Sequence, residues 1–452
     1  MRSECVVFVY LPKETKAVPA GILTIAQSGR DTASTFVYGS AYRRRENAIS
    51  LDPVELPIPD ADGQVFRPKN GKSLFGVFRD AAPDAWGRLV INDKYIRRQH
   101  HPLGKAPMAN AIDLPEVEYL LRSRSDRVGN LDFRETPTSE EPQKNISRVL
   151  HLEELVKEAN RIAQNKTARV DVLTLLRPAT GMGGARPKTT IEENGSMWLA
   201  KFPMDDDRLP ITKIEQGMLD LASKCGIETI EHKLVEVEGL KDPVFMIKRF
   251  DRLHTEEGNY QRIGYASALT ALGREEFNQS SGSYQEIALH LQRQADPDTQ
   301  LTERKELFTR MVFNVMVNND DDHLRNHGVL KFSGGRSKLS PVFDIVPRVV
   351  TPGVSSTRRL AIRLGVDGRD GTIENMLSDT DAFGISREEA ETEIRCVAFR
   401  VASNWMSCLK NAGCSQDVIQ TLEETMSHAK KVLRELSRYE TQEDQEYFES
   451  EI

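Results

Sequence analysis

Residues 318–327 read NNDDDHLRNH and directly follow the apolar, helix-like segment 305–317. Phosphoryl transfer needs a carboxylate that orients the attacking hydroxyl and accepts its proton, and a nearby amide oxygen that helps to hold Mg²⁺. Asp321 and Asn326, five positions apart, fit these two roles, and the same order occurs in the catalytic loop of protein kinases. For this segment alone, the structural alternative is a solvated loop whose Asn and Asp side chains make turn hydrogen bonds.

A second carboxylate follows this loop. Residues 331–337 contain a Gly-Gly turn, and residues 338–344, KLSPVFD, are predicted to form a strand that ends at Asp344. In protein kinases a metal-binding aspartate comes shortly after the catalytic loop, so Asp344 is predicted to take a metal position. Taken by itself, Asp344 could equally cap a turn.

A glycine-rich run, GMGGARPKT at residues 181–189, could let backbone N–H groups approach a triphosphate. It is not a P-loop, because Pro187 precedes Lys188 and a strand is predicted to follow. Two strands joined by an Asn-Gly turn are predicted next, and the second places Lys201 between apolar neighbours, where it would face inward toward ATP phosphates. The alternatives are a flexible turn and a lysine on the solvent face of the strand.

The last strand predicted before the helical half ends in MIKRFDR, residues 246–252. A kinase hinge that binds adenine through its backbone would occupy this position. The side chains of Arg249, Asp251 and Arg252 are interpreted as a structural ion-pair cluster.

The chain is too long, at 452 residues, for one hydrophobic core, so several packed units are expected. Short strands at 6–10, 22–26 and 35–38 and a helical pair at 74–90, with Asp84 as an N-cap, predict a small α+β unit. After about residue 265 the pattern is helical, and it includes a helix capped by Ser386. The predicted segments are an N-terminal α+β domain at 1–110, a connecting segment with a polar linker at 111–147, a nucleotide-binding lobe at 148–252, a helical lobe at 253–440 and an acidic tail at 441–452.

Composition excludes several classes of protein. No apolar run is long enough to span a bilayer, and the N-terminus lacks a secretory signal, so a cytoplasmic protein without membrane contact is expected. Five scattered cysteines without CxxC spacing indicate neither a disulfide framework nor a zinc site. A net charge of -7 argues against a large nucleic-acid surface, so DNA binding would need a basic partner.

Several motifs together resemble the HipA family of serine/threonine protein kinase toxins. They are GGARPK at 183–188, KFP at 201–203, KRFDR at 248–252, DDHLRNH at 321–327 and Phe343-Asp344, and FGVFRD and PDAWGR within 74–88 resemble the family's small N-terminal domain. The resemblance implies an α+β, two-lobed protein-kinase-like fold with a small N-terminal α+β subdomain and a mostly helical C-terminal lobe.

The resemblance also implies ATP and Mg²⁺ as cofactors and a role for each site residue. Asp321 would be the proton acceptor, Asn326 and Asp344 the metal ligands, and His323 and Phe343 would lie at the nucleotide. The remaining nucleotide contacts would come from the phosphate-binding residues Gly183, Gly184, Ala185, Arg186, Pro187, Lys188 and Lys201, and from the adenine hinge Lys248, Arg249 and Phe250.

The family supplies the toxin half of type II toxin–antitoxin pairs. A small helix-turn-helix, HipB-like antitoxin would carry most of the operator DNA recognition, and the protein substrate would be a translation component such as an aminoacyl-tRNA synthetase, with growth arrest and persistence as the result. The self-phosphorylated serine of the family aligns with Gly181, so Thr180 is the candidate in this chain. The rival interpretations are a catalytically degenerate co-repressor that acts with such an antitoxin, and a kinase of a small molecule or lipid.

Overall fold

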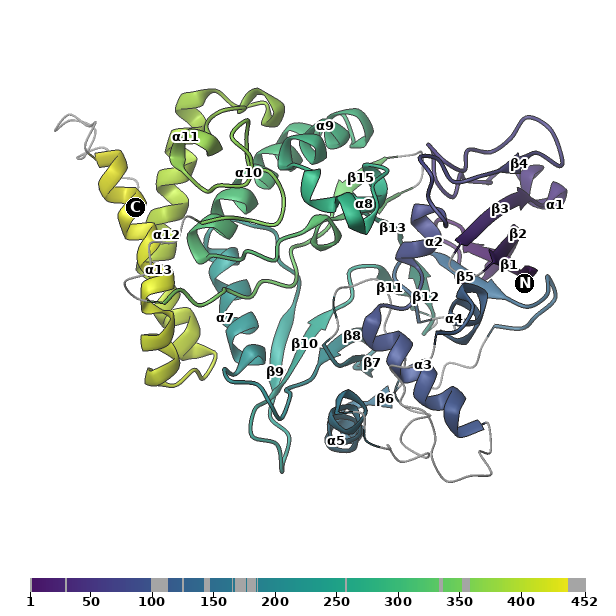
Figure 1. The fold of residues 1–452 in the computed structure, drawn as a ribbon, viewed down its shortest axis with the longest axis horizontal. Helices are drawn as coiled ribbons and strands as arrows, with labels where there is room; N and C mark the ends of the chain where they lie inside the picture. The colour runs from purple at the N-terminus through teal and green to yellow at the C-terminus, as the bar shows by residue number, and fades with distance from the viewer. Residues whose placement is uncertain are drawn as a thin grey trace. The chain divides into compact units, whose positions relative to one another are not determined.

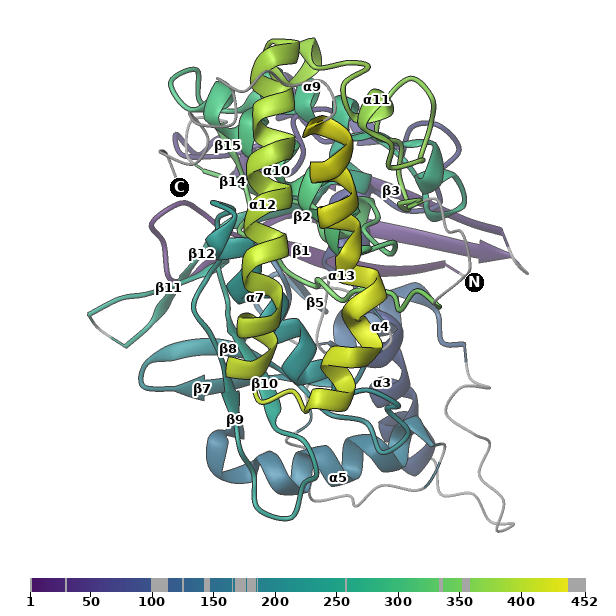
Figure 2. The same ribbon diagram turned by 90° about the vertical axis from the view of Figure 1, so that its left-hand side faces the viewer.

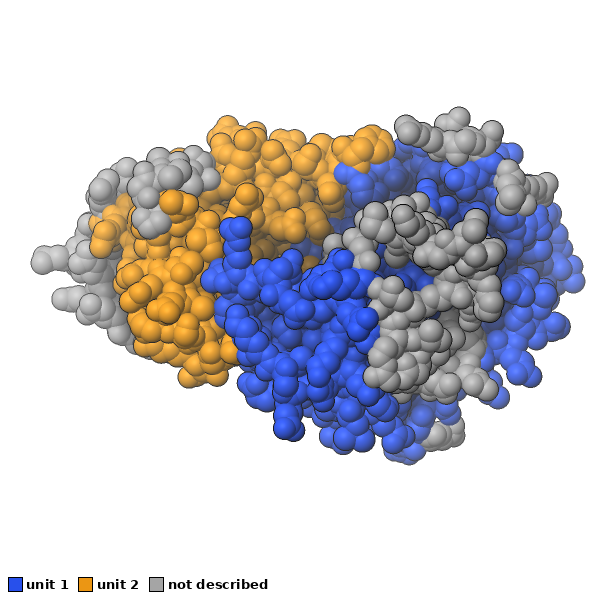
Figure 3. Space-filling model, turned by 60° about the horizontal axis from the view of Figure 1, so that its bottom comes forward, with its two compact units in different colours: residues 1–212, 230–276, 325–340 blue, residues 213–229, 277–324, 341–452 orange. Residues whose placement is uncertain are grey.

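Two units divide the chain in the computed structural model (Figure 3): unit 1 comprises residues 1–212, 230–276 and 325–340, and unit 2 comprises 213–229, 277–324 and 341–452. The division into five successive segments stays a prediction. The structure describes residues 2–28, 31–98, 113–123, 126–141, 147–164, 166, 176, 184, 186–256, 258–332, 336–351 and 358–437.

An antiparallel sheet forms the N-terminal part of unit 1 (Figure 1). Its strand order is β4-β3-β2-β1-β5, with β1 Arg2–Tyr10, β2 Ala17–Ser28, β3 Asp31–Tyr38, β4 Val65–Phe66 and β5 Leu131–Arg134. The three strands predicted here lie within β1, β2 and β3. Alternate residues of the strands join a core with α2 Gly76–Asp80 and α4 Glu116–Arg122, and this core includes Val7, Leu23, Phe36, Phe78 and Leu120. The short helix α1 Ser40–Arg43 follows β3.

A second sheet in unit 1 has the order β6-β7-β8-β10-β9. It contains β6 Ser147–Arg148, β7 Lys188–Glu193, β8 Ser196–Lys201, β9 His232–Val235 and β10 Val244–Lys248. Asn194 and Gly195, both with positive φ, form the turn between β7 and β8, which confirms the predicted hairpin. The 3₁₀ turn η2 Val149–His151 leads into α5 Leu152–Ala163, which packs with α3 Ala85–Arg98 in a core with this sheet.

Five further strands in the described part of unit 1 form two small sheets, so the second half of the chain is not entirely helical. β11 Arg252–His254 pairs with β12 Tyr260–Arg262, and β14 Gly328–Lys331 lies between β13 Gly264–Ser267 and β15 Ser337–Leu339. The helix α8 Ala268–Ala271 follows β13, and its N-cap Ser267 accepts a hydrogen bond from the backbone N–H of Thr270.

The strand predicted over 338–344 was wrong in its extent. β15 ends at Leu339, and the backbone of Asp344 is left-handed, with φ 62°. Ser340 N–H still donates to Gly328 O at 2.8 Å, but Pro341 has no N–H to continue the ladder. Asp344 therefore lies in an irregular segment instead of at a strand end.

Unit 2 is helical in its described residues. α7 Ile211–Lys224 begins in unit 1 and continues into unit 2, and η3 Glu276–Ser281 begins at the last residue of a unit 1 segment. The other elements are α9 Tyr284–Gln294, α10 Gln300–Val317, α11 Ile373–Met376, η6 Asp381–Phe383, α12 Arg387–Asn411 and α13 Gln416–Leu436. α12 and α13 run side by side and both pack on α10 (Figures 1 and 2).

The helix signals read from the sequence are confirmed. Ser386 and Glu389 form a reciprocal capping box at the start of α12, and the helical pair predicted at 74–90 corresponds to α2 and α3. None of the helices in the described ranges combines the length and the apolarity needed to cross a membrane.

Candidate active site

The acidic loop leaves the C-terminal end of α10 in a fixed conformation. Asn318 adopts a left-handed conformation with φ 57°, which asparagine tolerates better than most residues. Asn319 donates its backbone N–H to Asn314 O at 2.9 Å and its Nδ2 to Asn314 Oδ1 at 3.0 Å. The loop therefore starts from the helix end with its direction set by two amide side chains.

The same loop is joined to the segment that follows Asp344. Asn318 Nδ2 donates to Arg348 O at 2.8 Å, and Arg348 N–H donates back to Asn318 O at 2.9 Å. Arg348 Nη1 also lies 2.7 Å from Asp320 Oδ2. These three contacts, all within unit 2, hold the start of the acidic loop beside the segment that follows Asp344.

This junction gives a first testable prediction. Replacing Asn318 with Ala removes its bond to Arg348 and places a Cβ-bearing residue without a local polar partner at positive φ, so the free energy of unfolding should fall by about 2–3 kcal/mol. Asn318→Gly keeps the backbone conformation and loses only the bond, so it should cost about 1 kcal/mol. Urea denaturation of both variants measures the difference, and equal losses would contradict the assigned backbone strain.

The three consecutive aspartates have different environments. Asp320 pairs with Arg348, and the buried Asp322 accepts a hydrogen bond from the hydroxyl of Tyr284. Burial, followed by the charge of Asp322, raises the pKa of Tyr284 well above its ordinary value, so the tyrosine remains a donor. Asp321 is the exposed member of the three. The three carboxylates thus differ in their surroundings: Asp320 is partly buried, Asp322 is buried, and Asp321 is exposed.

The charge around Asp321 fits a general base near a cation. Partial burial raises the pKa of Asp321 above its ordinary value; the carboxylates of Asp344, Asp320 and Asp322 raise it further, and His323 opposes them. A divalent cation would relieve the repulsion among these carboxylates. The Nδ1 atom of His323 is buried without a hydrogen-bond partner in the described part of the chain.

Asp344 and Asn326 each have the oxygen donor chemistry of a magnesium ligand. No group of three or more His, Cys, Asp or Glu side chains within the described ranges could hold a metal ion. Mg²⁺ often takes only one or two protein carboxylates and completes its shell with waters and substrate phosphates. The half-buried Asp344 belongs to unit 2, whereas the buried Asn326 lies in the 3₁₀ turn η4 Leu324–Asn326 and belongs to unit 1.

The predicted phosphate-binding residues belong to unit 1. Lys201, 4% exposed, lies on β8 directly across from Lys188 of β7, so the inward orientation expected for Lys201 is confirmed. Lys188 is also buried and forms an ion pair with Asp84 at 2.9 Å. Arg186 pairs with Asp207 and donates its Nε to Phe202 O at 3.2 Å. Gly183, Ala185 and the candidate phosphorylation site Thr180 lie outside the described residues.

The predicted hinge has part of its backbone already hydrogen-bonded. Lys248 N–H donates to Glu231 O and Arg249 N–H donates to Met197 O, both at 2.8 Å. Adenine would therefore have to use other backbone groups of this segment. The ring of Phe250 stacks on that of Tyr265 with 6.1 Å between centroids. Phe343, the residue before Asp344, is buried in unit 2.

The interpretation of the hinge side chains as a structural ion-pair cluster is confirmed. Arg249 and Arg252 both contact Asp251, at 2.9 and 2.7 Å, and Arg249 also pairs with Asp126; all four side chains are buried. Burial alone would raise the pKa of Asp251, but the two guanidinium groups lower it to about 2. We call these four residues the Arg249 cluster. Sequence reasoning missed Asp126 because it lies more than a hundred residues before its partner.

The sequence predicts Asp84 of unit 1 only as a helix cap. Asp84 does cap α3, by accepting the backbone N–H of Gly87 at 2.8 Å, but it also contacts Lys188 at the start of β7. Trp86 reaches the same strand, since its Nε1 donates to Lys188 O at 2.8 Å. No local pattern connects PDAWGR to GGARPK, so this contact had no sequence signal.

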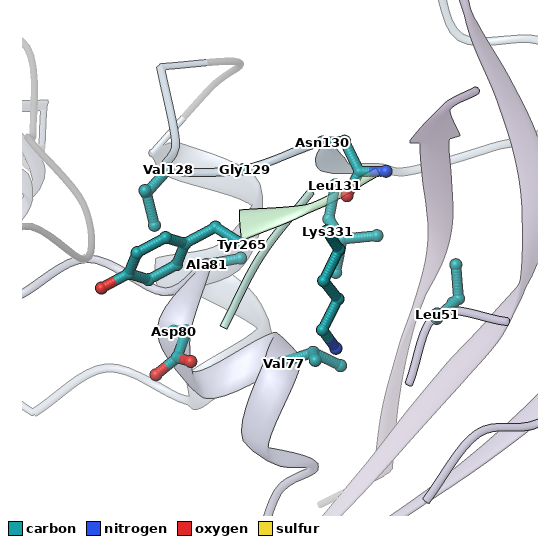
Figure 4. A pocket seen from close by; sticks show the side chains of 10 residues that line it. All are labelled: Leu51, Val77, Asp80, Ala81, Val128, Gly129, Asn130, Leu131, Tyr265 and Lys331. Carbon is teal, nitrogen blue, oxygen red and sulfur yellow. The ribbon is translucent and has the colours of Figure 1, made fainter. Parts of the chain in front are cut away.

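A small pocket in unit 1 is lined by residues of several segments (Figure 4). Its wall includes Asp80 of α2, which accepts hydrogen bonds from the backbone N–H of Ser267 at 2.7 Å and from the hydroxyl of Ser267 at 2.8 Å. None of the predicted nucleotide-binding residues lines it. The other lining residues include Val77, Gly129, Asn130, Tyr265 and Lys331.

Comparison with known proteins identifies the family. A family model described as the HipA-like C-terminal domain matches residues 180–405, which is half of the chain and contains Lys188, Lys201, Asp321 and Asp344. The chain belongs to the HipA-like family. The suspected family resemblance is thereby confirmed.

The curated relatives of this HipA-like chain match over shorter stretches. It is 25% identical over 158 residues to a protein of Haemophilus influenzae named "Putative kinase", covering 33% of this chain and 45% of that protein. It is also 25% identical over 210 residues to "Putative kinase Y4mE" of Sinorhizobium fredii, covering 45% of this chain and 46% of that protein. The chain thus spans less than half the length of these two relatives.

One solved structure is similar along nearly the whole HipA-like chain. It is HipA from the toxin–antitoxin system of Shewanella oneidensis MR-1, solved with HipB and operator DNA; it has 15% sequence identity and a TM-score of 0.63, and the match covers 96% of this chain and 97% of that one. At this identity the likeness shows the fold alone. It confirms the α+β fold class expected from the resemblance.

Proposed function

We propose that this HipA-like chain is an ATP- and Mg²⁺-dependent serine/threonine protein kinase. The observation that carries the proposal is the position of Asp321, an exposed carboxylate in a loop that Asn318 and Arg348 hold at the end of α10. Partial burial and the neighbouring Asp344 raise its pKa. A carboxylate base near a second carboxylate is the arrangement that hydroxyl activation beside a metal requires.

Each predicted residue has a distinct task in this proposal. Asp321 orients the substrate hydroxyl and accepts its proton as the hydroxyl oxygen attacks the γ-phosphorus; the bond from the γ-phosphorus to the β,γ-bridging oxygen breaks, and ADP leaves. Asp344 and Asn326 would hold Mg²⁺, which would neutralise charge on the phosphates when it is bound with ATP. Lys201 offers a buried cation to the phosphates, and the backbone of residues 248–250 provides the hinge for adenine.

Label transfer tests the activity directly. The purified protein is incubated with γ-labelled ATP, Mg²⁺ and a lysate of its host, and proteins are separated and analysed for phosphoserine and phosphothreonine. We expect label on at least one protein, and chelation of Mg²⁺ should abolish it. Wild-type protein that labels nothing, including itself, would rule out the protein kinase; label on lipids or small molecules alone would assign a different substrate class.

The metal role of Asp344 gives a separate prediction. Asp344→Asn removes one charged ligand but keeps the size of the side chain, so the Mg²⁺ concentration needed for half-maximal nucleotide binding should rise at least about tenfold. Asp370→Asn, a change at an acidic residue of unit 2 in a weak surface ion pair at 3.7 Å, is the control and should leave the titration unchanged. An unchanged titration for Asp344→Asn would remove this residue from the metal site.

We further propose a toxin role in the cytoplasm, inhibited by a small helix-turn-helix, HipB-like antitoxin that contributes most of the operator contact. Two observations support it: the solved HipA of similar fold was captured with HipB and operator DNA, and this chain carries a net charge of -7. The proposed substrate is a translation component such as an aminoacyl-tRNA synthetase. Induced expression should arrest growth, and the Asp321→Ala variant should not; equal arrest by both would contradict a catalytic toxin.

A further inference from the structure

Asp84 makes two contacts at once through its two carboxylate oxygens. Oδ1 accepts the backbone N–H of Gly87 and so caps α3, while Oδ2 lies 2.9 Å from Lys188 Nζ. Both side chains are largely removed from water, with 11% of Asp84 and 2% of Lys188 exposed. The cap fixes the carboxylate in one orientation, so the ammonium of Lys188 is held at a defined point next to the first turn of α3.

Lys188 transmits this position to the glycine-rich run. Its Nζ donates to Gly184 O at 3.2 Å, and its own carbonyl accepts from Trp86 Nε1. Gly184 has φ 71°, a conformation that glycine adopts without strain. The carbonyl of Pro187, the residue before Lys188, accepts a hydrogen bond from the backbone N–H of Phe202 at 3.0 Å. Gly184 and Lys188 are thus connected to the start of α3, and Pro187 is connected to Phe202, the residue after β8.

This geometry leaves Lys188 little freedom to reach a ligand. Its ammonium contacts the carboxylate of Asp84 and the carbonyl of Gly184. Removing the charge of Asp84 or of Lys188 would leave the other charge buried without this ion pair. Burial is the largest influence on Asp84 and raises its pKa, and the charge of Lys188 opposes that rise. The Asp84–Lys188 ion pair is therefore interpreted as an internal contact, called the anchor below, that holds Gly184 in place.

We infer that Asp84 is a positioning residue for nucleotide binding: through Lys188 it fixes the carbonyl of Gly184, and with it the end of the glycine-rich run, while Lys188 itself does not contact phosphate. This inference rests on the proposed function for its effect on ATP. It makes the PDAWGR segment part of the nucleotide site, although none of its residues would touch the nucleotide.

Asp84→Asn tests the anchor with little effect on the helix cap, because asparagine caps helices as well as aspartate. Lys188→Met removes the same ion pair from the other side. Glu116→Gln is the matched control, since it breaks a more exposed ion pair of the same helix, Arg88 to Glu116 at 2.7 Å. Hydrogen exchange at the amides of Gly184 and Arg186, thermal melting, and titration with a fluorescent ATP analogue are measured for all three variants.

For Asp84→Asn and Lys188→Met we expect faster exchange at Gly184 and Arg186, about tenfold weaker nucleotide binding, a matching rise in KM for ATP and a much smaller change in kcat. Glu116→Gln should change none of these. A change confined to melting, or faster exchange throughout unit 1, would reduce the pair to ordinary stabilisation and overturn the inference, as would unchanged exchange at Gly184. If Lys188→Met does not fold, Asp84→Asn decides the question.

The two proposals fail separately. Wild-type protein that binds no ATP would refute the proposed function, and the positioning role with it, whereas the exchange data would still show whether Asp84 holds Gly184. Faster exchange with unchanged ATP affinity would refute the positioning role alone.

Discussion

Asp321→Asn is expected to slow phosphoryl transfer by about 10²–10⁴-fold, the usual contribution of a positioned general base. Asparagine has the same shape but cannot accept the proton of the substrate hydroxyl. Nucleotide affinity should change less than about threefold, because Asp321 is not assigned to nucleotide or metal. Single-turnover transfer with saturating Mg²⁺ and ATP, together with a separate nucleotide titration, measures both quantities.

The neighbouring aspartates provide the controls. Asp320→Asn loses only the pair with Arg348 and should retain most of the activity. Asp322→Asn alters a buried contact with Tyr284, so it should lower stability more than it lowers the rate. If Asp320→Asn slows transfer as much as Asp321→Asn does, the assignment of the base within this loop is wrong.

Asp251→Ala should lower the free energy of unfolding by about 3–5 kcal/mol, because it leaves two buried guanidinium groups without the carboxylate that they share. The backbone N–H of Gly129, which donates to Asp251 at 2.8 Å, also loses its acceptor. Chemical denaturation measures the loss. Glu231→Gln, which breaks the exposed pair with Lys248 at 3.0 Å, is the control and should cost no more than about 1 kcal/mol.

Lowering the pH should remove the contribution of the Arg249 cluster to the free energy of unfolding. The pKa of Asp251 is lowered from 3.8 to about 2 on folding, so its charge stabilises the folded chain above pH 3.8, and this contribution is lost as the pH falls toward 2. The difference in stability between wild type and Asp251→Ala should therefore shrink over this window. A difference that stays constant from pH 5 to pH 2 would show that the carboxylate charge is not what stabilises the cluster.

Local features of the fold were predictable, because their causes lie within a few residues. The Asn194-Gly195 turn and the Ser386 capping box depend on backbone conformations and bonds that span at most four residues. The strand over 338–344 failed for an equally local reason. Its apolar pattern favours a strand, but Pro341 lacks the N–H that would continue the ladder.

The candidate site was predictable as a set of residue types but not as a set of contacts. Sequence spacing indicated an aspartate in the 320–322 run, but the difference among the three arises from Tyr284 and Arg348, which come from other segments. The partners of Lys188 and Arg249 in the N-terminal region had no local signal either. Their ion pairs connect positions more than a hundred residues apart, and side-chain periodicity carries no information over that separation.

The pairing of β13 with β14 has a consequence for how the protein is made. β13 ends at Ser267 and β14 begins at Gly328, and the intervening chain includes the unit 2 segment 277–324. During synthesis about sixty more residues must be added after β13 before β14 is made, so the two strands cannot pair until then. Such long-range pairing is slow to form. A fragment truncated after residue 276 would expose the edge of β13, so expression of unit 1 by itself would require a graft of residues 325–340.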